Sequence, residues 1–173
     1  KPTLQSTERQ VLLCWGNPWA QAGLALYLDE DLRPSIAAST AGATLTWSLE
    51  NRLELEHWYR VSATFELSGN AEIRMVDLGQ SVDQDVTKFE GTVQLRLAQN
   101  SEPIVLAAAP QGSSVEAPQD VRWHFNGLLE RPVIVSDKLL SEQDRVRLAD
   151  PADSRVAIDL SAAIVALWEF SAD

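Results

Sequence analysis

The sequence is short of the residues that most often build reactive centres. It has one cysteine, Cys14, and two histidines, His57 and His124. A single cysteine excludes an intrachain disulfide, and two histidines are too few for a typical zinc site without carboxylate or thiolate help. Cys14 lies in an apolar run, which indicates a buried strand residue rather than a nucleophile. Because disulfides are rare in reducing compartments, this cysteine usage favours a cytoplasmic location.

Long hydrophobic runs and basic residues are also scarce. No apolar run approaches the roughly 20 residues that a membrane-spanning helix needs, and no signal peptide is visible. The chain has 14 basic and 25 acidic residues, a net charge of −11. A nucleic acid or an anionic membrane would need a positive surface. The composition therefore predicts neither as a partner, and is compatible with cations or basic proteins.

Helix signals are limited to one stretch near residues 139–149. There Ser141-Glu142-Gln143-Asp144 resembles a capping box, with aspartate in the position where glutamate is usual. Val146 and Leu148 add only a thin apolar stripe. The sequence predicts one short surface helix.

Short alternating segments separated by turns account for most of the rest. The predicted strands span residues 11–15, 24–28, 33–38, 44–49, 57–65, 71–78, 91–98, 104–108, 156–160 and 163–170. Residues 79–88 and 109–120 are predicted loops. Many short strands with almost no helix predict an all-β, antiparallel β-sandwich.

The length of 173 residues fits one domain or slightly more. Residues 1–10 are polar without a period, and we expect a connector there. Residues 11–160 would form the sandwich, and residues 161–173 a closing strand or the start of a next domain. The chain starts without methionine and ends in an apolar run. We therefore expect a fragment of a longer polypeptide.

The Asn126-Gly127 pair and Pro34 predict two further local features. Residues 121–135 contain two apolar runs joined by Asn126-Gly127, a pair that tolerates positive φ. This arrangement predicts a late hairpin with its turn at that pair. Pro34 lacks an N–H group and places the strand at residues 33–38 near a sheet edge.

Several phrases resemble the laminin-G, concanavalin A-like jelly-roll superfamily. Residues 57–65, His-Trp-Tyr-Arg-Val-Ser-Ala-Thr-Phe, are similar to a phrase on a central strand of that family. Residues 23–31 resemble its early hairpin. Residues 125–132, Phe-Asn-Gly-Leu-Leu-Glu-Arg-Pro, resemble its late Phe-Asn-Gly-Lys-Ile-Asp-x-Pro phrase, with Leu-Leu-Glu in place of Lys-Ile-Asp. The resemblance implies a jelly-roll sandwich over about residues 8–160.

The late phrase is followed by residues 165–171, Val-Ala-Leu-Trp-Glu-Phe-Ser. Together they are similar to the laminin-G-like domain in the large subunit of N,N-dimethylformamidase-type proteins. In those proteins a different domain carries the metal-dependent amide hydrolysis. The resemblance therefore implies an accessory domain, whose partners are other domains or subunits of the parent protein.

Acidic residues provide the first candidate sites. Jelly-roll glucanases use paired carboxylates on one strand face, since retaining chemistry needs two carboxyls about 5 Å apart. Glu54 and Glu56 have the spacing for one face, but the middle aspartate of that motif is absent. The metal candidates are Asp29, Asp31, Asp83 and Asp85, whose carboxylates are hard oxygen ligands that suit Ca²⁺. The alternative for each pair is a solvated turn.

Trp19 and Asn17 are the candidate ligand-binding residues. They lie in a loop marked by glycine and proline, where an exposed tryptophan could stack on a sugar ring or fill an interface. The alternative is a tryptophan folded over the sandwich edge.

Three functions remain open from the sequence. The first is a non-catalytic β-sandwich module of a larger, N,N-dimethylformamidase-like protein, serving domain or subunit packing. The second is a lectin-like module that binds a glycan with the help of calcium. The third is a jelly-roll hydrolase with an unfamiliar site.

Overall fold

The computed structural model describes residues 1–20, 22–39, 43–65, 70–79, 84–89, 104–110, 121–130, 132–135, 140–149 and 164–167. The chain divides into two compact units. The first unit spans Lys1–Leu128 and the second spans Leu129–Asp173. Each unit is described by itself below.

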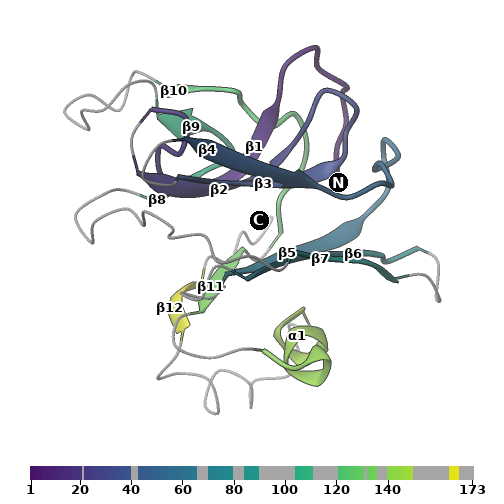
Figure 1. Ribbon diagram of the computed structural model, residues 1–173. Helices are drawn as coiled ribbons and strands as arrows, with labels where there is room; N and C mark the ends of the chain where they lie inside the picture. Colours follow the sequence, from purple (N-terminus) through teal and green to yellow (C-terminus); the bar gives the residue numbers. More distant parts are fainter. Residues whose placement is uncertain are drawn as a thin grey trace. The chain divides into compact units, whose positions relative to one another are not determined.

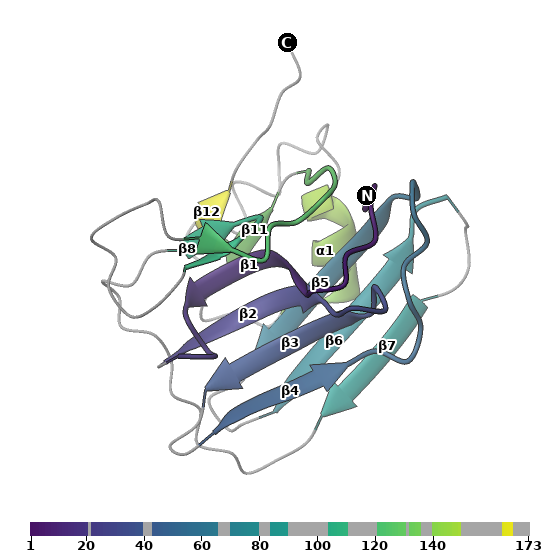
Figure 2. The ribbon, with the colours of Figure 1, turned by 90° about the horizontal axis from the view of Figure 1, so that it is seen from above.

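The first unit contains a five-stranded antiparallel sheet in the order β4-β3-β2-β1-β8 (Figure 2). Its strands are β1 (Gln10–Gly16), β2 (Gly23–Leu28), β3 (Pro34–Ser39), β4 (Thr44–Ser48) and β8 (Ile104–Leu106). The first four strands follow one another along the chain. In the turn between β2 and β3, the Asp29 carboxylate accepts hydrogen bonds from the N–H groups of Asp31 and Arg33. This local bonding explains why an acidic tripeptide reverses the chain here.

A three-stranded antiparallel sheet supplies the second layer of the first unit (Figure 1). It consists of β5 (Tyr59–Phe65), β6 (Ala71–Asp77) and β7 (Gln84–Phe89). Burial along β6 alternates, with Ala71, Ile73 and Met75 buried and the residues between them half-buried. β3 contacts β6, and Ile36 of β3 is also fully buried. Removing such side chains from water contributes roughly 1.5–3 kcal/mol each, so these apolar faces stabilise the sandwich.

The connection after β8 changes the partner of β1. A bulge in β1 occurs at Leu12, between the paired residues Val11 and Leu13. The Leu12 carbonyl accepts a hydrogen bond from Ala107 N–H, and Val11 N–H donates to the carbonyl of Trp123. β9 (Ala109–Pro110) and β10 (Val121–Arg122) then pair with each other. The edge of β1 is therefore shared between β8 and the segment that follows β10.

The N-terminal residues are attached to the end of the same unit. Thr3 N–H donates to the Asn126 carbonyl, and Leu128 N–H donates to the Lys1 carbonyl, each at 2.9 Å. The buried Gln10 side chain joins both segments, since its amide nitrogen donates to Leu4 O and its amide oxygen accepts from Asn126 N–H. Residues 1–10, which we expected to be a connector, thus include residues fixed to the sandwich at one end and the start of β1 at the other.

The second unit contains β11 (Val133–Val135), α1 (Glu142–Ala149) and β12 (Ile164–Leu167). β11 and β12 pair antiparallel. The predicted capping box is present at the helix start. Ser141 Oγ accepts from Asp144 N–H, and the Asp144 carboxylate accepts from Ser141 N–H. Leu148 is buried and packs with Val133, Val135 and Leu140.

The predicted hairpin at residues 121–135 is wrong. Val121–Arg122 pairs with Ala109–Pro110, and Val133–Val135 pairs with Ile164–Leu167. Gly127 bridges Pro2 instead of forming a turn. The Asn126-Gly127 pair has the composition of a hairpin turn, but glycine is needed at position 127 because other atoms approach its backbone closely. A Cβ at position 127 would overlap the Lys1 carbonyl oxygen and lie 2.5 Å from the Phe125 ring.

Three smaller predictions are also wrong. Residues 84–89 were expected to be loop and form β7, an end strand whose charged residues concealed its pattern. Ala109 was expected in an exposed loop and is fully buried. β3 lies between β2 and β4 rather than at an edge. Pro34 is tolerated because it is the first residue of the strand.

The predicted fold class is confirmed: the described residues form an all-β, antiparallel sandwich with one short helix. The expected strands at residues 91–98 and 156–160 lie outside the described residues. The jelly-roll connectivity therefore stays a prediction. In the described part of the chain, no helix is long and apolar enough to cross a membrane.

Replacing Gly127 with alanine tests the attachment of the N-terminal segment. We expect Gly127→Ala to lower the free energy of unfolding by about 1–3 kcal/mol, because the new Cβ meets rigid backbone and a packed ring. Gly79→Ala is the matched control, since its Cβ would meet only the Asp77 carboxylate oxygen at 3.3 Å. Urea unfolding of both variants measures the difference, and equal midpoints would contradict the proposed close approach.

Candidate functional site

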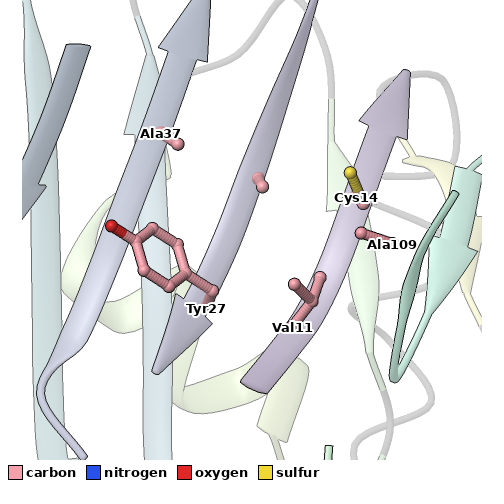
Figure 3. Close-up of a cluster of buried hydrophobic side chains, with 6 residues drawn as sticks. Val11, Cys14, Tyr27, Ala37 and Ala109 are labelled. Carbon is pink, nitrogen blue, oxygen red and sulfur yellow. The ribbon is translucent and has the colours of Figure 1, made fainter. Parts of the chain in front are cut away.

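One face of the five-stranded sheet carries a buried cluster made mostly of small side chains. The cluster consists of Val11, Cys14, Ala25, Tyr27, Ala37 and Ala109 (Figure 3). Residues paired directly across neighbouring strands share a face, as Val11 does with Tyr27. The small side chains leave space above the sheet, and Trp19 and Trp123 pack into it. The sequence thus provides a smooth platform for aromatic rings.

Three aromatic rings meet on this platform. Trp19 contacts Tyr27 edge-to-face, with ring centroids 5.4 Å apart, and contacts Trp123 in the same manner at 4.9 Å. Edge-to-face pairs place the positive edge of one ring against the negative face of another. Each such pair contributes about 0.5–1.5 kcal/mol beyond the area that it buries. Trp19 is therefore held in place by two rings rather than standing free on its loop.

Two arginines cover the rings. Arg9 Cζ lies 4.6 Å from the Trp123 centroid, 4.9 Å from that of Trp19 and 5.9 Å from that of Tyr27. Arg122 Cζ lies 3.5 Å from the Trp123 centroid. All four distances are within the range in which a guanidinium is attracted to a ring. We call these five residues, Arg9, Trp19, Tyr27, Arg122 and Trp123, the arginine–tryptophan cluster.

Backbone contacts fix both tryptophans. Trp123 adopts a left-handed conformation, with φ of 57°, which is uncommon for a bulky residue. Its carbonyl accepts the Val11 N–H at 2.8 Å, which ties this strained residue to β1. Asn17 is buried, its side-chain nitrogen donates to the Pro110 carbonyl at 2.8 Å, and its oxygen accepts from Trp19 N–H. Asn17 thus positions Trp19 by anchoring the loop to β9.

The cluster holds two buried N–H groups that lack acceptors. Trp19 Nε1 and Arg122 Nε are both inaccessible to solvent and have no hydrogen-bond partner. Leaving a buried donor unpaired costs about 1–3 kcal/mol, and more for a charged group. Most buried polar groups in proteins are paired, so two such donors in one cluster need an explanation.

The predicted ligand-binding residues are therefore held in place by neighbouring groups of the protein. Trp19 was a candidate for an exposed aromatic, with a tryptophan folded over the sandwich edge as the alternative, and it is half-buried beneath Arg9. Asn17 was a candidate for ligand contact, and its side chain bonds to the Pro110 carbonyl and the Trp19 N–H. The sequence analysis did not identify Arg9, Tyr27 or Arg122. These residues are far apart in the sequence, so no local sequence pattern indicates that they share a site.

The calcium candidates at the β2–β3 turn are engaged within the turn. One oxygen of Asp29 accepts two N–H groups of its own loop, and Asp31 lies 3.4 Å from Arg33. Asp85 lies in β7, where its backbone pairs with Met75, and Asp83 lies outside the described residues. Among the described residues, no group of three His, Cys, Asp or Glu side chains is placed to hold a metal ion.

The carboxylate pair considered for glycan hydrolysis does not lie on a strand. Glu54 and Glu56 belong to the turn before β5, and Glu56 has a left-handed φ of 64°. Glu56 pairs with the Lys1 ammonium at 2.8 Å, while Glu54 lies 3.7 Å from His57. His57 also lies 3.7 Å from Asp77, so these groups join the turn to the end of β6.

The Cys14 thiol is buried and stays neutral. Burial raises the pKa of its thiol to about 12, and the thiol donates a hydrogen bond to the Gly16 carbonyl. Burial also raises the pKa of Tyr27. Because the thiolate is the reactive form of cysteine, a buried neutral thiol is a packing residue, as the sequence indicated.

Comparison with known proteins adds no family assignment. No protein-family model matches the chain, and no curated protein matches it. The site must therefore be interpreted from its own residues.

The raised pKa of Cys14 gives a pH-dependent prediction. In the unfolded chain the thiol ionises near its ordinary pKa of about 8.5, whereas in the native state it stays neutral until about pH 12. Between these values the unfolded state releases a proton that the native state keeps. The contribution of Cys14 to stability is therefore complete below about pH 8.5 and is lost as the pH rises above it.

We expect the wild-type chain to lose stability between about pH 8.5 and 10 more steeply than Cys14→Ala, which lacks the thiol. Urea unfolding at several pH values gives the two slopes, and taking their difference removes the contribution of the tyrosines. Parallel slopes, or rapid alkylation of Cys14 in the native chain at pH 8, would contradict the buried neutral thiol.

Proposed function

We propose that this chain is a non-catalytic β-sandwich module of a larger protein, and that it serves domain or subunit packing. The observation that carries the proposal is a set of large apolar side chains exposed on neighbouring segments of the first unit. We call this set the apolar rim. It consists of Leu4, Leu55, Trp58, Leu78 and Leu128, which are 36–58% exposed.

Backbone hydrogen bonds join the segments that carry the rim. Glu56 N–H donates to Pro2 O, which links the segment of Leu55 to the segment of Leu4. Leu128 N–H donates to Lys1 O, and Leu78 N–H donates to Trp58 O. Residues far apart in the sequence are thus brought to one region. A single exposed leucine needs no explanation, but exposed apolar residues on adjoining segments are typical of interaction surfaces.

Charged groups border the same region. The Lys1–Glu56 ion pair and the contacts of His57 with Glu54 and Asp77 lie on the segments that carry the rim. Interfaces between proteins commonly have an apolar centre with aromatic residues and a polar border. Trp58 would be the aromatic residue at the centre of such an interface.

The positions of the candidate reactive groups support a packing role over catalysis. Cys14 is buried with a raised pKa, and the Asp29 carboxylate is used by its own turn. Glu54 and Glu56 point to different partners rather than forming a pair. These contacts give each group a structural task.

The partner we propose is another domain or subunit of an amide hydrolase of the N,N-dimethylformamidase type. This part of the proposal rests on the resemblance of residues 125–132 and 165–171. A glycan is a weaker candidate, because Trp19, the ring predicted to stack on a sugar, is covered by Arg9 and neighbouring rings.

Substitution of the rim tests the packing role in the complete gene product. We expect the double variant Leu55→Glu/Leu78→Glu to keep its fold, because both side chains are exposed, and to lose contact with the partner. A fully buried leucine contributes roughly 1.5–3 kcal/mol, so two such losses are enough to open a moderate interface. Hydrogen exchange of residues 54–58 and 76–79 measures the opening.

Val146→Glu is the matched control, since Val146 is 50% exposed and belongs to the second unit. Faster exchange in the rim variant alone supports the proposal. If wild type and rim variant exchange at the same rate, the rim is not an interface. Saturable binding of an uncharged glycan that depends on Trp58 would favour the lectin-like alternative.

A further inference from the structure

Two positively charged groups share one aromatic ring in the arginine–tryptophan cluster. Arg9 precedes β1 and Arg122 ends β10, yet their Cζ atoms lie 4.6 and 3.5 Å from the Trp123 centroid. Like charges held against the same ring repel each other, most strongly where water is partly excluded. A nearby negative charge would relieve this repulsion.

Among the described residues, no ion pair supplies such a charge. Neither arginine has an ion pair or a hydrogen bond there, although the chain has 25 acidic and only 14 basic residues. By contrast, Arg33 lies 3.4 Å from Asp31, and Arg74 pairs with Glu72. Each clustered guanidinium lies over a ring, a contact that uses none of its N–H groups as hydrogen-bond donors.

The side-chain polar groups of the two arginines and two tryptophans in the cluster are all hydrogen-bond donors. Trp19 Nε1 and Arg122 Nε are buried without acceptors, and an arginine or a tryptophan side chain has no acceptor atom to offer in return. A ligand that completes this arrangement must therefore bring acceptor oxygens. The two planar guanidinium groups match the geometry of a carboxylate or a phosphate.

Charge and surface favour the carboxylate. A chain with a net charge of −11 repels a doubly charged phosphate more than a singly charged carboxylate. Trp19 and Trp123, which are half-buried, also keep some apolar surface beside the guanidinium groups. We propose that Arg9 and Arg122, together with Trp19 and Trp123, form a binding site for an organic carboxylate whose carbon frame rests against the rings.

The backbone around the cluster fits a ligand site. Trp123 holds a left-handed φ of 57°, and Ala107, which follows β8, holds a φ of 59°. Such conformations are concentrated at ligand-binding positions, where the surrounding structure compensates their cost. The bulge at Leu12 lies between them in the hydrogen-bond network, and bulges commonly redirect side chains beside functional sites.

Two carboxylate probes distinguish the sources of such a ligand. Glucuronate represents an acidic sugar, with glucose as its uncharged match, and N-acetylphenylalanine represents a peptide carboxyl terminus, with its amide as the match. Tryptophan fluorescence and the NMR signals of the indole N–H groups are followed during each titration. We expect a saturable change with at least one of the two acids and none with its uncharged match.

Substitutions then assign the effect to the cluster. Arg9→Gln and Arg122→Gln should each weaken binding by about 10-fold or more, the effect of one charged hydrogen bond. Arg52→Gln is the matched control, because Arg52 is exposed and lies outside the cluster. Added salt should also weaken binding, since the attraction is electrostatic.

Several outcomes would overturn the proposal. They are the absence of a saturable change with both acids, an equal change with the uncharged matches, and equal weakening by Arg52→Gln. If the glutamine variants do not fold, the indole signals of the wild-type chain still decide, because the Trp19 and Trp123 signals must shift with the acid. The apolar rim uses other residues, so failure here leaves the packing proposal unaffected.

Discussion

The backbone of β1 is largely buried, so its N–H and C=O groups must be paired within the protein. β2 pairs with one edge of the strand throughout its length. The other edge pairs with β8 over Leu13–Trp15, and its Val11 N–H bonds to the Trp123 carbonyl. The Leu12 bulge lies where the partner changes. Much of the first unit depends on this division of pairing partners along β1, because it determines the path of the segment after β10.

The arginine–tryptophan cluster follows from the same division. Bonding of Trp123 to Val11 places an indole ring against the buried cluster, where small side chains leave space. Trp19 reaches the same place because Asn17 anchors its loop to Pro110. The apolar rim arises separately, from the attachment of the N-terminal residues. The two proposals therefore concern two distinct surfaces, the apolar rim for packing and the arginine–tryptophan cluster for a carboxylate.

The sequence predicted elements well where one local rule determined the outcome. Alternation identified the strands that became β1 to β6, and the Ser141–Asp144 capping box marked the start of α1. It failed where two rules competed. Asn126-Gly127 satisfies the composition of a hairpin turn, but the glycine is required by the close approach of the Lys1 carbonyl. β7 was missed because charged residues on an end strand resemble a loop.

By itself, the sequence determined that the chain is an all-β sandwich with one short helix and a buried, unreactive cysteine. These properties depend on residue periodicity and hydrophobicity, which are local. Only the tertiary structure decided which strands pair across long intervals, and hence that Arg9, Trp19 and Trp123 meet. The physical reason is that pairing is set by backbone hydrogen bonds and by the space that small side chains leave. Neither of these is encoded in the order of residues around any one of the three.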